Sequence, residues 1–399
     1  MRGQIEATSS LPALWTSAPL RELCSFHNGL WKGKKAPFET VNVIRNTNFK
    51  AGGRIDLTDV AVLEVEARQF AKRRLLKNDI IIEKSGGGPK QPVGRVVLFD
   101  LDSGNYSFSN FTSAIRVEDV QRIHPIFLHR VLYYWYLSGK TEPLQRHSTG
   151  IRNLDFDNYK ELHVPLPPLE EQKRIVAVLD QAFAALDRAR AHAEANLTDA
   201  KEMFDSWLSS AFEFGHENWP KKKLPDIAEN LDRLRVPITK KDRRSGDVPY
   251  YGASGVVDHV QEHIFNEDLL LVSEDGANLL ARTYPIAFSI SGKAWVNNHA
   301  HVLRFGDLDS QEFVRLYLNS IDLEPWVSGM AQPKLNQKAL SSIPIPFPGI
   351  ADRSRIVEEA VDVWRESQAL ARNYDAQLTD IADLRQSLLQ KAFSGQLTA

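Results

Sequence analysis

Two stretches of the chain share one pattern of hydrophobic and polar positions, and each predicts a long helix. In 174–212 and in 355–393, apolar residues return every three or four positions, which is the spacing of a coiled-coil seam. The two stretches align without a gap through Arg-Ile-Val, Leu-Thr-Asp and Ala-Phe. At about 1.5 Å per residue, each helix would be on the order of 60 Å long. An amphipathic helix of this length needs a partner, and each stretch offers one to the other.

Both seams contain one extra step of four residues at the same height. The step lies at 193–197 in the first stretch and at 374–378 in the second. A stutter of this kind locally unwinds a supercoil. The second seam is the weaker of the two, because Ser367 and Arg385 occupy core positions.

The repeat extends to the segments that precede the helices. The interval from Trp15 to Leu20 equals the interval from Trp219 to Leu224. A proline-spaced strand end opens each helix, as "PLPPLEEQKRIV" in the first half and "PIPFPGIADRSRIV" in the second. A repeat of this length and order indicates a tandem duplication.

Each half begins with a globular segment that mixes strands and a helix. Short apolar runs predict strands at 41–49, 79–84, 93–100, 107–117, 248–254, 268–273, 285–291 and 299–305. Helical patterns follow at 125–137 and 310–320, so each segment is predicted to be an α+β domain. The predicted boundaries are 1–150 and 215–330 for the globular domains, and 151–214 and 331–399 for the helix regions.

Composition describes an ordinary globular chain that has room for several domains. Of its 399 residues, 43% are hydrophobic and 25% are charged, and its net charge is −2. The apolar runs are strand-sized and shorter than a membrane span, and no signal peptide opens the chain. The single cysteine, Cys24, excludes an internal disulfide and a cysteine-based zinc site. We therefore expect a cytoplasmic protein without membrane contact.

The loops of the first globular segment combine glycine with basic and amide side chains. Glycine lets the backbone approach a ligand, lysine and arginine neutralise phosphates, and amides can pair with base edges. The candidate DNA-binding residues here are Lys32, Lys34, Lys35, Arg45, Asn46, Asn48, Lys84, Ser85, Lys90, Gln91 and Arg95.

The second globular segment offers a comparable set of loop residues. The candidates are Lys240, Lys241, Arg243, Arg244, Tyr250, Tyr251, Ser254, Asp275, Asn278, Asn297 and Asn298. A basic run is usually a solvated face, so no single residue decides between a surface and a DNA contact. Such loops recur at matching places in both halves, which favours nucleic acid as the partner.

Catalytic motifs are absent from the sequence. The Gly-rich loop at 85–94 is not a P-loop, because no Gly-Lys-Ser/Thr follows at the required spacing. The Asn/Asp-Pro-Pro-aromatic motif of amino-methyltransferases is also missing. His299 and His301 have no nearby carboxylate or cysteine in the sequence, so we expect them on a strand face and not at a metal site. The sequence predicts no catalytic, metal or cofactor site.

Together these features resemble the specificity subunit of type I restriction-modification enzymes. The resemblance covers nearly the whole chain, including both globular-plus-helix halves. It rests on "PLPPLEEQKRIV", "GMAQPKLNQKALSSIPIPFP", "LRQSLLQKAFSGQLT" and "VPYYGASGVVDHV" followed by "LLLVSEDGAN". The second joint departs from the pattern, because it lacks the Glu-Glu-Gln found at 170–172.

The resemblance implies two tandem target-recognition domains of mixed β-sheet and helix. Two long antiparallel coiled-coil helices would separate them in a pseudo-twofold internal duplication. Each domain would read one half of an asymmetric, bipartite site in double-stranded DNA. A spacer longer than a DNA turn of about 34 Å would leave unread base pairs between the halves.

The resemblance also implies partner subunits. The helices would dock two modification methyltransferase subunits, which carry S-adenosylmethionine, and restriction/translocase subunits would join the complex. This chain itself would contribute recognition and assembly, without a cofactor or catalysis of its own.

Three other interpretations stay open at the level of sequence. The chain could be a coiled-coil assembly adaptor that does not read DNA, or a fused modification or restriction enzyme. It could also be an orphan specificity subunit of a modification-only methyltransferase. Methyl transfer by the purified chain would favour the enzyme, and assembly without any effect on site choice would favour the adaptor.

Overall fold

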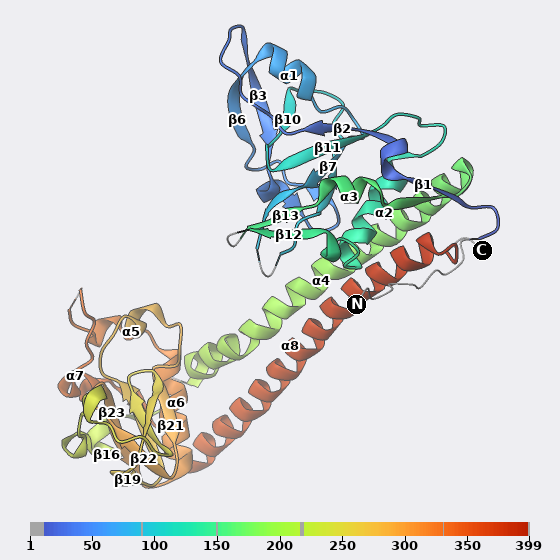
Figure 1. The fold of residues 1–399 in the computed structure, drawn as a ribbon. Coiled ribbons are helices and arrows are strands. Elements are labelled where there is room, and N and C mark those ends of the chain that lie inside the picture. Colours follow the sequence, from blue (N-terminus) through green and yellow to red (C-terminus); the bar gives the residue numbers. More distant parts are fainter. Residues whose placement is uncertain (1–11, 89–90, 149–150, 216–218, 330, 398–399) are drawn as a thin grey trace. The chain divides into compact units, whose positions relative to one another are not determined.

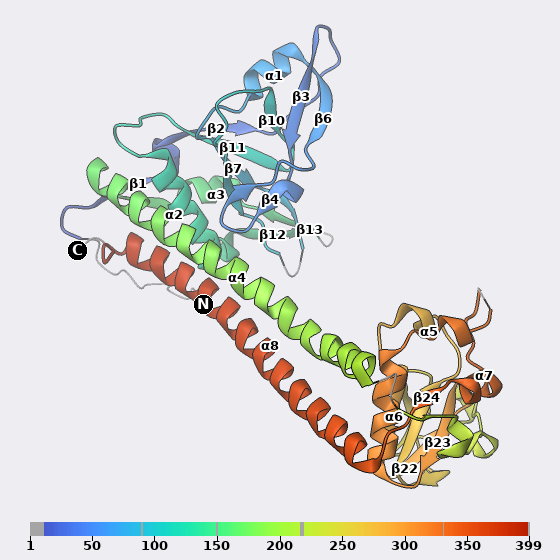
Figure 2. The ribbon, with the colours of Figure 1, turned by 180° about the vertical axis from the view of Figure 1, so that it is seen from behind.

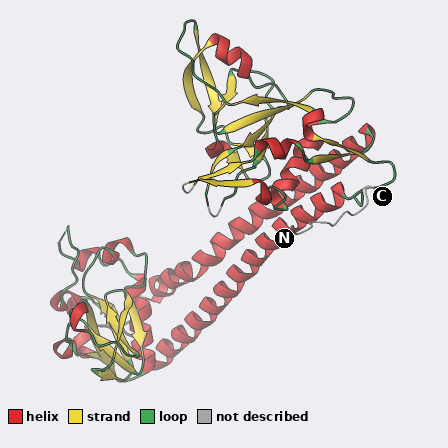
Figure 3. Ribbon diagram, in the orientation of Figure 1, coloured by secondary structure: helices red, strands yellow, loops and turns green. Residues whose placement is uncertain are grey.

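The computed structural model describes residues 12–88, 91–148, 151–215, 219–329 and 331–397 (Figure 1). The chain forms two compact units. The first unit consists of Met1–His192 and Gln377–Ala399, and the second of Ala193–Ala376. This division cuts both long helices beside the predicted stutter, so each unit contains one end of each helix. The boundaries predicted from sequence instead assign each long helix to a region of its own. Each unit mixes strands and helices (Figure 3).

The first unit is built on an antiparallel sheet in the order β2-β11-β7-β9. Its strands are β2 (Cys24–Asn28), β11 (Thr112–Val117), β7 (Ile80–Glu83) and β9 (Val96–Leu98). A second sheet has the order β10-β3-β6, in which β10 (Tyr106–Phe108) lies parallel to β3 (Phe38–Ile44) and β6 (Ala61–Glu66) lies antiparallel to it.

Smaller elements complete the first unit. Further strands are β12 (Gln145–Ser148), β13 (Ile151–Leu154) and β8 (Ser85–Gly87) in one sheet, and the pairs β1 (Thr16–Pro19) with β14 (His163–Leu166) and β4 (Phe49–Lys50) with β5 (Arg54–Ile55). The helices are α1 (Ala67–Arg73), α2 (Pro125–Leu137), α3 (Phe156–Lys160) and the 3₁₀ turns η1 (Leu20–Glu22), η2 (Asn46–Asn48) and η3 (Glu142–Leu144).

The second unit repeats this plan. Its main sheet has the order β16-β23-β20-β21, formed by β16 (Ala228–Asn230), β23 (Ala300–Phe305), β20 (Leu269–Ser273) and β21 (Ala287–Ile290). The other sheet has the order β18-β17-β22-β19, formed by β18 (Gly255–Val260), β17 (Val248–Gly252), β22 (Lys293–Val296) and β19 (Phe265–Asn266). The strand β17 lies parallel to β22, as β3 lies parallel to β10.

Several of the remaining elements of the second unit also have counterparts in the first. The remaining elements are the pair β15 (Lys221–Lys222) with β24 (Ile345–Pro346), the helices α5 (Asn278–Ala281), α6 (Leu308–Ser320) and α7 (Gln337–Ser342), and the 3₁₀ turns η4 (Leu224–Asp226), η5 (Asp232–Leu234), η6 (Lys240–Asp242) and η7 (Glu324–Trp326). The helices α2 and α6 both contain 13 residues and occupy the same place in the order. The structure therefore confirms the duplication and the α+β fold.

One inner strand of each main sheet, β7 in the first unit and β20 in the second, is buried on both faces. Ile80 and Ile82 of β7 belong to the core that includes α2 and the long helices, whereas Ile81 packs in a second core on the other face. In β20, Leu270 faces the helices and Leu271 faces the second sheet. Burial on two faces explains why these strands read as continuous apolar runs without a polar alternation.

The helices α4 (Leu169–Gly215) and α8 (Ile350–Phe393) pack antiparallel in both units (Figure 2). In the first unit Asp187 contacts Arg385, and in the second the Ser367 hydroxyl donates to the Ala200 carbonyl at 2.7 Å. The two polar residues that weaken the predicted seam are thus paired at the helix contact, where Ser367 is buried and Arg385 is partly buried. Ala189 departs from the predicted seam, because it is exposed.

The proline-rich joint is built in the same way in both halves. The Gln172 amide of α4 is buried and donates to the Pro167 carbonyl at 2.9 Å. At the corresponding position of α8, the buried Arg353 guanidinium donates to the Pro348 carbonyl and lies 4.1 Å from the centre of the Phe347 ring. Arginine therefore replaces the glutamine that the second joint lacks. None of the described helices is long and apolar enough to cross a lipid bilayer.

The buried His129 of α2 predicts an acid-sensitive first unit. Burial, followed by the charge of Arg130, lowers the pKa of His129 to about 3. The unfolded chain binds a proton near the ordinary histidine pKa of about 6.5, so the unfolded state binds more protons between these values. The free energy of unfolding should therefore fall as the pH is lowered through this window. The test is the slope of the free energy of unfolding against pH, measured by urea unfolding between about pH 7 and pH 5. We expect His129→Gln to reduce this slope by up to about 1.4 kcal/mol per pH unit.

The exposed His259 provides the matched control for this measurement. His259→Gln should leave the slope of the first unit unchanged. An identical slope in the wild-type chain and His129→Gln would contradict the assignment of the buried neutral ring.

Candidate nucleic-acid interface

A groove of about 690 Å³ lies in the first unit, where the two sheets meet the loop after β7. Five of the residues predicted from sequence line it: Lys32, Arg45, Asn46, Gln91 and Arg95. Apolar side chains from β3, β4 and β6 form other parts of its wall. The fold thus brings together loops that are up to about sixty residues apart in the sequence.

A buried ion pair supports this groove. Glu83, at the end of β7, is 2% exposed and accepts hydrogen bonds from Arg95 Nε at 2.7 Å and Nη2 at 2.9 Å. Asn46 Nδ2 donates to the same carboxylate at 2.9 Å and to the Ser85 carbonyl at 3.0 Å. The forked face of Arg95 is therefore already used inside the protein. Asn46 and Arg95 are held at fixed positions in the groove wall.

Other candidates in the groove keep their polar groups near solvent. Arg45 is half-exposed, and its closest carboxylate, Asp59, lies 3.6 Å away. Lys32 and Gln91 are exposed. With its amide oxygen turned toward Arg95, Gln91 accepts from Nη1 at 2.7 Å and leaves its NH₂ group for other partners. These three side chains can still donate to a ligand in the groove.

The groove also contains residues that the sequence did not single out. Ser109, Asn110 and Phe111 form the turn between β10 and β11, inside a stretch predicted as one strand. Phe111 is 46% exposed, so part of its ring is open to a ligand in the groove. The Ser-Asn pair was the signal for this turn, since both residues favour turns.

Three other candidates of the first unit have structural partners. Asn48 is buried, and its amide accepts from the Arg45 N–H and donates to two backbone carbonyls, so we assign it to the support of the loop. Ser85 donates to Asn153 Oδ1 at 2.6 Å. Lys84 donates to Asn28 Oδ1 at 3.1 Å, and burial, followed by the charge of Lys160, lowers its pKa.

The remaining candidates of this unit are three lysines, two of which lie on an exposed turn. Lys34 and Lys35 are exposed, and their backbone N–H groups donate to Glu66 Oε2 at 3.2 Å. Their side chains are thus carried on a fixed turn beside the groove. Lys90 lies outside the described residues.

In the second unit, the candidates around β17 divide into support and surface. Tyr250 is buried, and its hydroxyl accepts from the Ile238 N–H at 3.0 Å. The Arg243 guanidinium lies 4.3 Å from the centre of the Tyr250 ring and donates to Asp258 at 2.9 Å, which raises the pKa of Arg243. Tyr251 is half-buried beside Phe288. Tyr250 and Arg243 therefore hold the hairpin in place.

The exposed candidates of the second unit lie on its loops. They are Lys240, Lys241, Arg244, Ser254 and Asn298. Together they provide three cations, a hydroxyl and an amide, which suit contacts to phosphates and base edges.

Three candidates near β23 are tied into turns. Asp275 contacts His299 Nδ1 at 2.9 Å. The Asn278 side chain bonds to the backbone of Tyr284 through both its oxygen and its nitrogen. Asn297 is buried and accepts from the His299 N–H at 2.8 Å. These three side chains therefore stabilise the loops through contacts within the protein.

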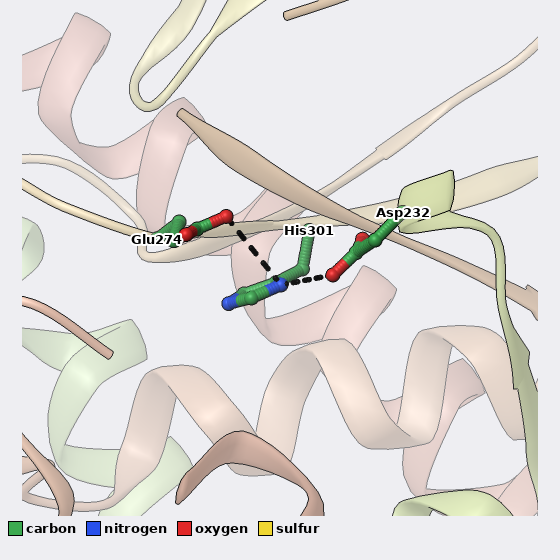
Figure 4. Close-up of side chains that lie close together, drawn as sticks. All are labelled: Asp232, Glu274 and His301. Carbon is green, nitrogen blue, oxygen red and sulfur yellow. Dashed lines mark hydrogen bonds and ion pairs between the residues drawn. The ribbon is translucent and has the colours of Figure 1, made fainter. Parts of the chain in front are cut away.

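His301, Asp232 and Glu274 form a buried cluster with metal-ligand atom types (Figure 4). His301 is confirmed as a strand residue of β23, but the strand prediction is wrong for His299, which lies in the turn before β23. Neither histidine is far from a carboxylate in the folded chain, since His299 contacts Asp275. The His301 Nδ1 lies 2.6 Å from Asp232 and 3.8 Å from Glu274. This cluster could not be predicted from the sequence, because the two acids lie far from His301 along the chain.

The contacts around the cluster favour a structural role over a metal site. Both ring nitrogens of His301 face oxygen atoms, since Nε2 lies 2.7 Å from the Leu335 carbonyl. Arg235 lies 2.6 Å from Glu274, and Lys334 lies 3.2 Å from it. These protein cations already occupy the positions that a metal ion would need.

The cluster also explains the titration of its acids. Burial acts to raise the pKa of Asp232, but the hydrogen bond and charge of His301 outweigh it and leave that pKa below its ordinary value. Burial also acts to raise the pKa of Glu274, but the hydrogen bond from Arg235 and the charge of His301 outweigh it and lower that pKa.

Equivalent positions in the two units contain different chemistry. The Lys84 carbonyl accepts from the Leu154 N–H at 2.8 Å, and the Glu274 carbonyl accepts from the Leu335 N–H at 2.8 Å. In the first unit this position presents a lysine to the amide of Asn28, and in the second it presents a carboxylate to cations. The same scaffold therefore holds two different polar networks.

Comparison with known proteins identifies the family. The family profile described as type I restriction modification DNA specificity domain matches residues 12–195 and 216–359, one range in each repeat. These ranges cover more than half of the chain. This chain belongs to the type I restriction modification DNA specificity family. The match confirms the resemblance that the sequence motifs predict.

Individual members of this specificity family are distant from the chain. A Haemophilus influenzae protein named as a type I restriction enzyme specificity subunit is 31% identical over 153 residues, which span 38% of this chain and 39% of that protein. The StySPI specificity subunit of Salmonella potsdam is 22% identical over 430 residues, which span 98% of this chain and 90% of that protein. The first match thus spans less than half of its relative, and the second spans most of it.

A solved structure shares the fold of this specificity-family member. That solved structure comes from a study of complex assembly and conformational transition of the type I R-M system. Its TM-score is 0.75 at 18% identity, with 97% of this chain and 100% of that chain covered. At this identity the likeness shows the fold alone.

The Glu83–Arg95 pair gives a direct test of the groove wall. Glu83→Gln keeps the shape but leaves Arg95, which is 20% exposed, without its counter-charge. Breaking a buried pair from one side costs about 3–5 kcal/mol, so we expect a loss of stability of roughly 3 kcal/mol in urea unfolding of the first unit.

The exposed pair of Lys77 and Asp102 supplies the matched control. Asp102→Asn should cost less than about 1 kcal/mol, because water screens an exposed pair. Equal and small losses in both variants would show that Glu83 does not support the groove.

Proposed function

We propose that this chain is the DNA-recognition subunit of a type I restriction-modification complex, and that each unit reads one half of a bipartite site. The observation that carries the proposal is the duplicated fold with different loop chemistry in its two copies. Two copies of one scaffold suit one task performed twice, and different loops suit two different half-sites. The asymmetry of the proposed site follows from this divergence.

The groove of the first unit provides the recognition surface in this proposal. Arg45 can contact a phosphate or a guanine edge, and the NH₂ group of Gln91 can donate to a base acceptor. Lys32, Lys34 and Lys35 flank the groove as phosphate contacts. The buried Glu83 carboxylate would set the position of the loop without itself touching DNA, because Glu83 is 2% exposed.

The hairpin and loops of the second unit would play the same part for the other half-site. Lys240, Lys241 and Arg244 supply the cations, and Ser254 and Asn298 supply groups that can donate and accept. Tyr250 and Arg243 would fix the hairpin that carries Ser254.

The helix pair would serve assembly. Two similar helix-and-domain units present two similar surfaces, so two copies of a modification methyltransferase would bind with pseudo-twofold symmetry. Those subunits would carry S-adenosylmethionine, and restriction/translocase subunits would complete the complex. The chemistry would belong to these partners, and site choice to this chain.

Methylation mapping tests the proposed function directly. Adenine methylation would be mapped across the genome of the native host with and without this gene. We expect loss of methylation at one asymmetric, two-part motif, since no other subunit would supply that specificity. A fully assembled complex with an unchanged methylation map would favour the adaptor over the specificity subunit.

Exchange of one recognition domain tests the independence of the two readers. We expect replacement of residues 15–150 by the corresponding segment of another specificity subunit to change one half of the methylated motif and to leave the other half intact. The reciprocal exchange of 219–330 is the control and should change the opposite half. A change of both halves after a single exchange would refute independent readers.

A further inference from the structure

A second cavity, of about 190 Å³, lies in the first unit beside the helix pair. Three arginines line it: Arg54 from β5, Arg130 from α2 and Arg385 from α8. Phe183 and Ala184 of α4 form part of its floor. We call this cavity the arginine pocket, and neither the groove nor the proposed function makes use of it.

The charges around the arginine pocket do not balance. Arg54 and Arg385 share one carboxylate, that of Asp187. Arg130 pairs with Asp180 at 2.9 Å. Three guanidinium groups therefore contact two carboxylates. Guanidinium groups stay charged at any physiological pH, so this excess cannot be removed by deprotonation.

Two of the three arginines are held in place and partly shielded from water, whereas the Arg54 side chain is 65% exposed. Arg385 is 13% exposed and Arg130 is 16% exposed. Their guanidinium carbons lie 4.5 Å and 5.4 Å from the centre of the buried Phe183 ring, which orients both groups. Asp180, which also lines the pocket, and Asp187 offset the repulsion among the three cations only in part, so a further anion would be favoured there.

One donor at the arginine pocket remains unsatisfied. Arg130 Nε is buried and has no hydrogen-bond partner among the residues that the structure describes. An unpaired buried donor carries a desolvation penalty, which is larger when the donor is charged. Arg130 is therefore not fully satisfied by the protein, and a bound oxyanion would neutralise the excess charge of the pocket.

We propose that the arginine pocket binds one phosphate-type oxyanion. Arginine forks match the oxygen geometry of phosphate, and a volume of about 190 Å³ holds the equivalent of roughly six waters, which leaves room for a single tetrahedral group. The anion is either free inorganic phosphate or a phosphate of the DNA backbone. The second source rests on the proposed function, because Arg54 follows closely in sequence after Arg45 and Asn46 of the groove.

Ala184 allows the pocket to be filled from within. Its side chain is exposed on α4, so substitution there does not disturb the core. Ala184→Glu places a carboxylate in the pocket, and Ala184→Gln places a side chain of the same size without charge. We expect Ala184→Glu to raise the melting temperature of the full chain by about 2–4 °C over Ala184→Gln.

The first arm of the test measures free anion. The full-length chain is titrated with inorganic phosphate by calorimetry at constant ionic strength, with chloride as the balancing anion. If the source is free phosphate, the wild-type chain binds one equivalent, Arg385→Gln weakens binding about tenfold, and Ala184→Glu abolishes it. Arg365→Gln removes one positive charge from an exposed pair on the same helix and should bind phosphate as the wild-type chain does.

The second arm measures DNA phosphate. The assembled complex binds DNA carrying its motif over a range of salt concentrations, and the slope of log affinity against log salt is compared between Ala184→Glu and Ala184→Gln. If the source is DNA, the Glu variant loses about one unit of slope. Unchanged slopes, together with no phosphate binding in the first arm, would overturn the proposal. A complex that binds no DNA would count against the proposed function, while the first arm would still decide on the pocket.

Discussion

The rest of each unit depends on one constraint: the central strand of its main sheet is covered on both faces. Neither β7 nor β20 can carry polar side chains along its length, so both are short and apolar and end abruptly at polar residues. The chain then returns to the same place through a backbone hydrogen bond to the residue after the strand, Lys84 or Glu274. Polar chemistry is therefore concentrated where the strand leaves the sheet.

That concentration has a cost, because charges next to a dry core need partners. In the first unit Arg95 neutralises Glu83 and Asn46 donates a hydrogen bond to it, and in the second unit cations surround Glu274. Many side chains with the chemistry of DNA contacts are consequently used to stabilise the loops that carry the proposed contact surface. Residue type alone does not separate these two duties, since both need the same hydrogen-bonding groups.

The fold could be predicted from sequence much further than the site. Periodicity and the internal repeat predict the long helices, the main strands and the duplication, because burial imposes a period that a sequence displays. Residue type also predicts several loops that line the groove. It could not show that Asn48 and Tyr250 are buried, or that Asp232 meets His301. Those facts depend on contacts between distant segments, which one sequence does not reveal.

The self-contained polar network of each unit has a consequence for genetic recombination. A crossover inside a main sheet would place a lysine such as Lys84 beside the cations that pair with Glu274, namely Arg235 and Lys334. Positive charges would then lie together without a carboxylate. A crossover within the proline-rich joint or the helices would transfer each network whole, because Gln172 and Arg353 perform the same backbone contact there. The physical units of inheritance in such a gene are therefore whole recognition domains, and new specificities would arise by shuffling them.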